Sequence, residues 1–163
     1  MCGIAGVLNF RGHSPLNHLI KLSDGMKHRG PDDEGFYVIH KLGNKGVDYI
    51  GNSSNPNITE YKHFKTAQSQ SFTHGILHRR FSILDTSIKG HQPIKTEDGK
   101  LILSFNGEIF NYVEIRKELL EKGYEFISTS DTEVVLKAYQ EWGVDCFNMF
   151  NGFWAIAFLD MEK

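Results

Sequence analysis

Residues 100–112 read KLILSFNGEIFNY and pass from an apolar run through a polar turn signal to the start of a helix. The apolar part, residues 100–105, predicts a strand covered on both faces, because almost every position in it is hydrophobic. A helical pattern follows to about residue 122, and Asn111 with Glu114 resembles a capping box at its start. The stretch therefore predicts a buried strand that leads through a turn into an amphipathic helix.

Further strands and helices are predicted on both sides of this stretch. Short apolar or alternating runs predict strands at residues 3–10, 34–40, 46–51, 74–85, 124–127 and 152–160. Helical spacing predicts helices over 15–28 and 130–142, and Ser130 with Glu133 forms a second capping-box pattern. Residues 52–72 are polar with little periodicity and are predicted as a surface excursion. Because strands outnumber helices and come in runs, the order favours α+β layers over a doubly wound parallel sheet.

The composition is that of one globular domain and argues against several functions. The chain has 163 residues, is 40% hydrophobic and 23% charged, and carries a net charge of -2 without a basic stripe, so nucleic acid is not an expected partner. No apolar run approaches the ~20 residues that span a bilayer, and the N-terminus does not resemble a signal peptide. With only Cys2 and Cys146, a reducing, cytoplasmic setting is predicted.

Cys2 directly follows the initiator methionine and precedes small residues. If Met1 is removed, Cys2 carries both a thiol and an α-amine, whose ordinary pKa values lie near ~8.5 and ~7.7–8.0. A thiolate is a nucleophile and an unprotonated α-amine is a base, so one residue would supply both groups. Taken alone, an accidental cysteine is the simpler interpretation.

Two further candidates lie at predicted element ends. Asn106-Gly107 can direct a side-chain amide and a backbone N–H to one point, which are the parts of an oxyanion hole, although ordinary turn chemistry also explains the pair. Asp131 lies at a predicted helix N-terminus, where the helix dipole alone accounts for an acid. Neither residue identifies a site by itself.

Charged residues near two other predicted strands complete the set of candidates. An arginine inside an apolar strand is costly unless it meets an anion, and alternation turns one of Arg79 and Arg80 inward and the other outward. The pattern does not decide which. The acids at residues 32–34 follow His28, but hard-cation loops space their ligands and this cluster is contiguous, so no metal site is expected. No nucleotide-binding glycine motif is present.

Taken together, six stretches resemble the N-terminal glutaminase domain of glutamine-hydrolysing asparagine synthetases, which are class II glutamine amidotransferases and N-terminal nucleophile hydrolases. The stretches are MCGIAGV, MKHRGPDDEG, HRRFSILD with GHQPI, LSFNGEIFNY, SDTEVVLKAYQEWG and MFNGFWAIAFLD, in family order. The resemblance implies a four-layer αββα fold with two stacked, mostly antiparallel sheets. It also implies hydrolysis of L-glutamine to glutamate and ammonia through a cysteinyl thioester.

The same resemblance implies roles for individual residues. Cys2 would supply nucleophile and base, and Asn106 with the Gly107 amide would form the oxyanion hole. The residues that would bind glutamine are Arg80, Asn106, Gly107, Glu108 and Asp131. The loop that would close over the substrate contains His28, Arg29 and Gly30. The chemistry of glutamine agrees, because an arginine can bind its carboxylate bidentately and acids can bind its ammonium.

The resemblance also concerns what accompanies this domain. Residues 1–163 are expected to form one type 2 glutamine amidotransferase domain that ends before its last strands, with the ATP-dependent synthetase domain absent. The expected partners are L-glutamine, that C-terminal domain and a second copy in a homodimer, with neither nucleic acid nor membrane among them. No cofactor or metal is expected in this domain, since ATP and magnesium would serve the synthetase domain.

Several alternatives stay open at this point. The acceptor of the ammonia can be aspartate, a sugar carboxylate or another acid, and residues 52–72 resemble relatives encoded among surface-polysaccharide genes. An inactive glutamine-binding scaffold is a second interpretation, against which the presence of both Cys2 and Asn106 counts. A self-contained amidase acting on another amide is a third, against which Arg80 with Asp131 counts.

Overall fold

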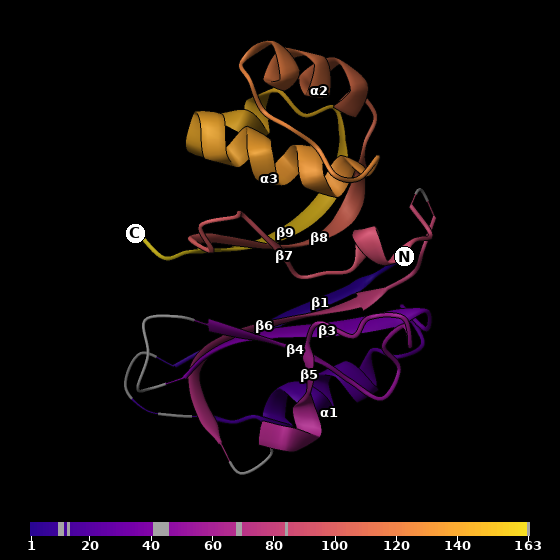
Figure 1. Ribbon diagram of the computed structural model, residues 1–163, viewed down its shortest axis with the longest axis vertical. Helices are drawn as coiled ribbons and strands as arrows, with labels where there is room; N and C mark the ends of the chain where they lie inside the picture. Colours follow the sequence, from indigo (N-terminus) through magenta and orange to yellow (C-terminus); the bar gives the residue numbers. More distant parts are fainter. Residues whose placement is uncertain (10–11, 13, 41–45, 68–69, 84, 163) are drawn as a thin grey trace.

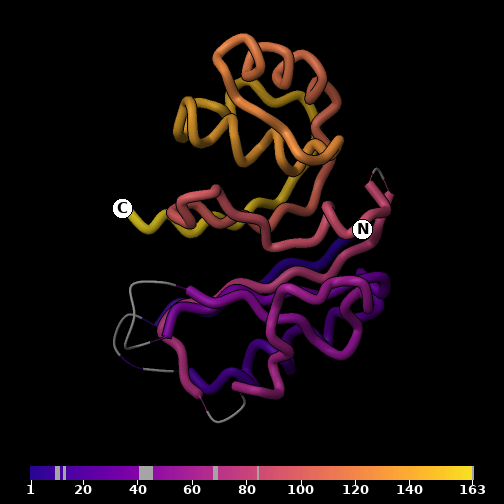
Figure 2. The backbone as a smooth tube through the Cα atoms, in the orientation of Figure 1, coloured from indigo at the N-terminus to yellow at the C-terminus, as the bar shows by residue number. Residues whose placement is uncertain are grey.

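The computed structural model describes residues 1–163 except 10–11, 13, 41–45, 68–69, 84 and 163. Its backbone forms four layers: one helix, a larger sheet, a smaller sheet and a pair of helices (Figure 1). Figure 2 shows the N-terminus at the level between the two sheets. The predicted α+β class, with two stacked and mostly antiparallel sheets in an αββα order, is confirmed.

The larger sheet has the strand order β1-β6-β3-β4-β5, with β2 also paired to β6. Its pairs are antiparallel except β4 with β5. The strands are β1 (Gly3–Leu8), β2 (Ser14–Pro15), β3 (Asp33–His40), β4 (Gly46–Ile50), β5 (Lys62–His63) and β6 (Ser71–Arg80). Helix α1 (Asn17–Gly25) covers the outer face of this sheet, where Leu19, Phe36 and Leu77 belong to one buried apolar cluster.

The smaller sheet has the order β7-β8-β9 and is antiparallel. Its strands are β7 (Ile94–Lys95), β8 (Leu101–Ile109) and β9 (Gly152–Asp160). Helices α2 (Tyr112–Glu121) and α3 (Asp131–Trp142) cover its outer face (Figure 1). Three short 3-10 helices complete the described structure: η1 (Phe64–Ala67), η2 (Ile88–Gly90) and η3 (Gly143–Asn148).

Side chains of β8 alternate between two buried layers. Leu103 and Phe105 belong to the cluster under α2 and α3. Ile102 packs with residues of the larger sheet, and the Ser104 hydroxyl lies 3.0 Å from Nδ1 of His78 on β6. Successive residues of a strand point to opposite faces, so burial on both faces requires the nearly continuous apolar run that the sequence shows.

The turn predicted at Asn106-Gly107 is wrong. Both residues continue strand β8, because β8 stays paired with β9 as far as Ile109. A Cβ atom on Gly107 would lie 2.4 Å from the Phe153 carbonyl oxygen of β9. The glycine is therefore needed for the close approach of two strands rather than for a turn.

Neither of the two predicted capping boxes forms completely. Asn111 does not cap α2, because its side chain bonds the Met149 carbonyl and the Asn151 amide. Ser130 does cap α3 by accepting from the Glu133 amide at 3.4 Å. The Glu133 carboxylate does not return to the Ser130 amide but accepts the backbone N–H groups of residues 127 and 128. The strand predicted at 124–127 does not form.

The segment at residues 52–72 is only partly a surface excursion. It contains β5, η1 and the start of β6. Ile58 and Phe64 within it are buried, and Phe64 packs edge-on against Phe36 of β3. Ala67 and Phe72 are also buried, so the prediction holds for the polar turns but misses the apolar residues that anchor the segment.

Candidate active site

A cavity of about 390 Å³ lies where the ends of β1 and β6 meet β8, β9 and the N-terminus of α3. Its wall contains six residues that the resemblance assigned to chemistry or to glutamine binding: Cys2, Arg80, Asn106, Gly107, Glu108 and Asp131. They come from both sheets and one helix, and they are far apart in the sequence. The fold alone brings them together.

Cys2 precedes β1 and is half-buried. Its Sγ accepts the Phe81 backbone N–H at 3.3 Å and lies 3.6 Å from the Phe81 carbonyl oxygen. The Cys2 carbonyl accepts from Nε of Arg29 at 3.1 Å. Met1 also lines the cavity, and 69% of its surface is exposed. The thiol is thus held against the backbone directly after β6, at the mouth of the cavity.

Alternation along β6 separates Arg79 from Arg80. Arg79 points to the α1 side, where its Nε donates to the Ser23 carbonyl at 3.0 Å and Nη2 lies 3.0 Å from Oε2 of Glu34. The second contact is an ion pair rather than a well-aligned hydrogen bond. The expectation that the other arginine points outward is wrong, because α1 covers that face and Arg79 is fully buried. Arg80 lines the cavity.

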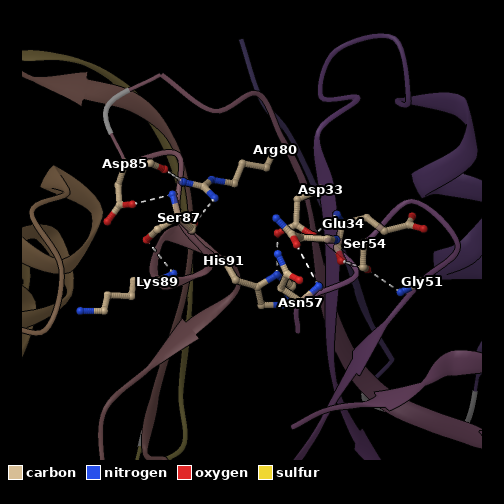
Figure 3. A network of polar contacts seen from close by, with 11 residues as sticks. Asp33, Glu34, Gly51, Ser54, Asn57, Arg80, Asp85, Ser87, Lys89 and His91 are labelled. Carbon is tan, nitrogen blue, oxygen red and sulfur yellow. Dashed lines mark hydrogen bonds and ion pairs between the residues drawn. The ribbon is translucent and has the colours of Figure 1, made fainter. Parts of the chain in front are cut away.

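The guanidinium of Arg80 holds the following loop in place. Nη1 donates to the Ser87 carbonyl at 2.9 Å, and Nη2 donates to the Asp85 carbonyl (Figure 3). A Cβ atom on Gly90 would lie 2.0 Å from Nη2, so this approach requires a glycine. These bonds use two of the five N–H donors of a guanidinium, and the remaining donors can bind an anion in the cavity.

The direction of the Gly107 amide follows from its neighbours on β8. The Phe105 N–H donates to Oε1 of Gln92 at 2.7 Å, and the Ile109 N–H donates to Oδ2 of Asp131 at 3.1 Å, both on the edge away from β9. Amides of alternate residues in an antiparallel strand point to the same edge. The Gly107 N–H therefore points to the same edge of β8 as those two amides, and both Gly107 and Asn106 line the cavity.

Two carboxylates lie on the same wall. Asp131 is the first residue of α3, and only 5% of it is exposed. Burial raises the pKa of Asp131, and the charge of Glu108 adds to this, while the hydrogen bond from the Ile109 amide acts in the opposite direction. A bound ammonium would lower that pKa again, so Asp131 is suited to pair with a cation.

The loop at residues 28–30 lies beside the cavity but does not line it. His28 is exposed, and Arg29 binds the Cys2 carbonyl. Gly30 is buried, and a Cβ atom there would lie 2.4 Å from the Arg79 carbonyl oxygen. The loop therefore braces the base of Cys2 and the end of β6, and its closure over a substrate stays a prediction.

Several wall residues were not singled out from the sequence. The wall also contains Phe81, Ile83, Gln92, Thr132 and Trp154. The strand was expected to continue to residue 85, yet β6 ends at Arg80; residue 84 lies outside the described residues. Gln92 stands in the quoted GHQPI stretch, but no local pattern shows that its side chain reaches a strand amide.

The acids at residues 32–34 stabilise the fold. Asp33 pairs with Nδ1 of His91 at 2.7 Å (Figure 3). Glu34 accepts from the Ser23 hydroxyl at 2.7 Å. Among the described residues, no group of three or more His, Cys, Asp or Glu residues could hold a metal ion. No helix of that part of the chain is long and apolar enough to cross a membrane.

The fold defines the class. The chain is similar to the structure of glutamine phosphoribosylpyrophosphate (PRPP) amidotransferase from B. subtilis complexed with ADP and GMP, with a TM-score of 0.74, 20% identity, and coverage of 97% of this chain and 35% of that one. It is also similar to the structure of the allosteric regulatory enzyme of purine biosynthesis, with a TM-score of 0.73, 19% identity and the same coverage. The chain therefore has the fold of these two structures.

The sequence defines the family. Residues 63–163, more than half of the chain, match the model described as a glutamine amidotransferase domain, and the chain belongs to this family. The whole chain aligns with 28% of the length of the putative asparagine synthetase [glutamine-hydrolyzing] 2 of Methanocaldococcus jannaschii, with 32% sequence identity. It also aligns over its whole length with 18% of asparagine synthetase [glutamine-hydrolyzing] 2 of Bacillus subtilis, with 31% sequence identity. The resemblance to the glutaminase domain of asparagine synthetases is confirmed.

The chain spans less than a third of the length of these curated relatives. The same holds for asparagine synthetase [glutamine-hydrolyzing] 1 of Arabidopsis thaliana, where 98% of this chain is 31% identical to 22% of that protein.

Proposed function

We propose that this domain hydrolyses L-glutamine in the described cavity, with Cys2 as the nucleophile. The observation that carries the proposal is that a thiol, an arginine, the Asn106-Gly107 pair and a buried acid all line one space of about 390 Å³. Glutamine has one carboxylate, one ammonium and one amide, and the cavity offers a complementary group for each. Arg80 would bind the carboxylate, and Asp131 with Glu108 would bind the ammonium.

In the proposed reaction, the α-amine of Cys2 takes the thiol proton and the thiolate attacks the amide carbon. The oxygen of the tetrahedral intermediate gains negative charge and accepts from the Asn106 side chain and the Gly107 N–H. The amine then returns the proton to the departing nitrogen, which leaves as ammonia and gives a thioester. Water attacks the thioester, releases glutamate and restores the thiol.

We propose that the ammonia serves a carboxylate activated by ATP on a C-terminal synthetase domain. The relatives are named asparagine synthetases and are several times longer than this chain, which supports a second domain and favours aspartate as acceptor. A sugar carboxylate is the alternative. Supplying the full-length protein with glutamine, ATP and either acid, and identifying the amide product by mass spectrometry, separates the two.

The glutaminase proposal is tested by comparing protein with and without Met1, separated by intact mass. Removal of Met1 creates the free α-amine, whereas in the longer form the same nitrogen is an amide and cannot act as a base. We expect glutamate release from the Met1-free form only. If the form that retains Met1 is equally active, the α-amine is not the base.

Cys146 provides an internal control for the same test. Burial raises the pKa of the Cys146 thiol to about 11, with the charge of Asp145 adding to this. A glutamine-like chloroketone should therefore place one label on Cys2 and none on Cys146, because the thiolate is the reactive form. A glutamine site at Cys2 would be contradicted if the reagent labels Cys146, or if added glutamine does not slow the labelling of Cys2.

A further inference from the structure

We propose that Gln92 is a positioning residue for the reaction, and that the buried Asp33–His91 pair holds it in place. This inference rests on the proposed function. The nucleophile Cys2 lies at the end of the larger sheet, whereas Asn106 and Gly107 belong to the smaller sheet. The distance between thiol and oxyanion donors therefore depends on how the two sheets are held together, and an error of about 1 Å can cost ~10²-fold in rate.

On the smaller sheet, the Gln92 side chain accepts a β8 amide hydrogen bond at a position where β7 no longer pairs with β8. Strand β7 pairs with β8 only opposite Ile102 and Leu103. Beyond that point, Oε1 of Gln92 accepts the Phe105 N–H at 2.7 Å, one residue before Asn106. With Asp131 bound to the Ile109 amide, the edge of β8 is fixed on both sides of Gly107. The oxyanion donors thus lie between two side-chain anchors.

On the larger sheet, β3 packs directly against the His91 ring and the Gln92 carbonyl. A Cβ atom on Gly35 would lie 2.2 Å from the Gln92 carbonyl oxygen and 2.7 Å from the His91 ring. Only 6% of Gln92 is exposed, and its Nε2 lies 3.5 Å from the Thr132 hydroxyl, which it contacts as a donor. Gln92 therefore spans the layer between the two sheets.

The residue before Gln92 is bound to the same strand by a buried hydrogen bond. Nδ1 of His91 lies 2.7 Å from Oδ2 of Asp33, and Oδ1 of Asp33 accepts the amides of Glu34 and Asn55 at 2.9 and 3.0 Å (Figure 3). The His91 ring also packs against Tyr61, with centroids 5.6 Å apart. A carboxylate with three partners has little freedom, so the larger sheet sets the place of Gln92.

Loss of this bridge should act on the chemical step more than on binding. Gln92→Met keeps the side-chain length but removes the acceptor of the buried Phe105 amide, so the edge of β8 is free to move. Arg80 and Asp131 keep their own anchors at Ser87 and Ile109. We therefore expect kcat for glutamine to fall about 10–100-fold, while KM stays within ~3-fold.

The test uses Met1-free protein with Gln92→Met and, as the matched control, Gln140→Met, which makes the same change at an exposed position of α3. Steady-state kinetics give kcat and KM, and alkylation by iodoacetamide measures the reactivity of Cys2. Amide spectra of ¹⁵N-labelled protein report the Phe105 and Gly107 signals. In Gln92→Met we expect a lower kcat and shifts of both signals, with unchanged alkylation of Cys2. In the control we expect kcat, alkylation and both signals to stay as in the wild type.

A second pair of variants decides the matter if Gln92→Met does not fold. His91→Leu removes the donor to Asp33 and should lower kcat, whereas His91→Asn can place an amide nitrogen near the position of Nδ1 and should restore it. A wild-type kcat in folded Gln92→Met or in His91→Leu refutes the positioning role, as does a matching rise in KM. Absence of glutamate release from the Met1-free wild type would refute the proposed function instead.

Discussion

The adjacent arginines of β6 offer a matched perturbation of site and core. Lysine at position 80 keeps a positive charge but cannot bind a carboxylate bidentately, and it cannot reach both carbonyls of the following loop. Charge-assisted hydrogen bonds contribute about 1.5–3 kcal/mol, and each ~1.4 kcal/mol is a tenfold change in affinity. Arg80→Lys should therefore raise KM for glutamine about 10–100-fold.

Arg79→Lys should act on stability alone. Arg79 is fully buried, and the substitution removes the Nε donor to the Ser23 carbonyl and the planar partner of Glu34. Poorly paired groups in the interior cost about 1–3 kcal/mol. Since ~1 kcal/mol corresponds to about 2–4 °C in a protein of this size, Tm should fall by roughly 2–12 °C while KM is unchanged.

Both variants are assayed by glutamate release and by thermal unfolding. A rise in KM for Arg79→Lys with none for Arg80→Lys would show that the wrong face of β6 has been assigned to the substrate. A loss of stability in both without any change in KM would mean that Arg80 only fastens its loop and does not bind the glutamine carboxylate.

Three further predictions concern strands β6 and β8, one from each sheet. Asn106→Ala should lower kcat for glutamine about 10²–10³-fold with little effect on KM, and an unchanged kcat would remove Asn106 from the mechanism. Gly107→Ala would place a Cβ atom 2.7 Å from the Trp154 Cα, so Tm should fall and hydrolysis should be lost together; a wild-type Tm contradicts the close approach of β8 and β9. Burial lowers the pKa of His78 from 6.5 to about 3, so between these pH values the folded state binds fewer protons than the unfolded state. The free energy of unfolding should therefore fall as pH drops through this window, by up to ~1.4 kcal/mol per pH unit. Denaturant titrations at several pH values should show that the free energy of unfolding depends less on pH in His78→Gln.

The layers of the fold follow from local patterns. The run at residues 100–105 is apolar at adjacent positions, and a strand with that pattern must be covered on both faces, as β8 is. The spacing of apolar residues likewise predicts α3 over 131–142, because its inner face is long and regular. Strand propensity misleads at 124–127, where the Tyr124 amide bonds the Leu119 carbonyl and the Ile127 amide bonds the Glu133 carboxylate.

The family resemblance predicted six residues of the cavity wall, but it predicted neither the remaining wall residues nor the arrangement of the six. Asn106-Gly107 has the composition of a turn, and its continuation as a strand depends on β9, which lies about 50 residues further on in the sequence. The same holds for Gln92, whose partner is a backbone amide of Phe105, a group that every residue but proline carries. A local pattern cannot mark such a bond, because only the acceptor is chosen by the sequence and the donor is chosen by the register of the sheet. The Gln92 contact between the two sheets is of this kind, and in the proposed mechanism it helps to set the distance between the thiol and its oxyanion donors.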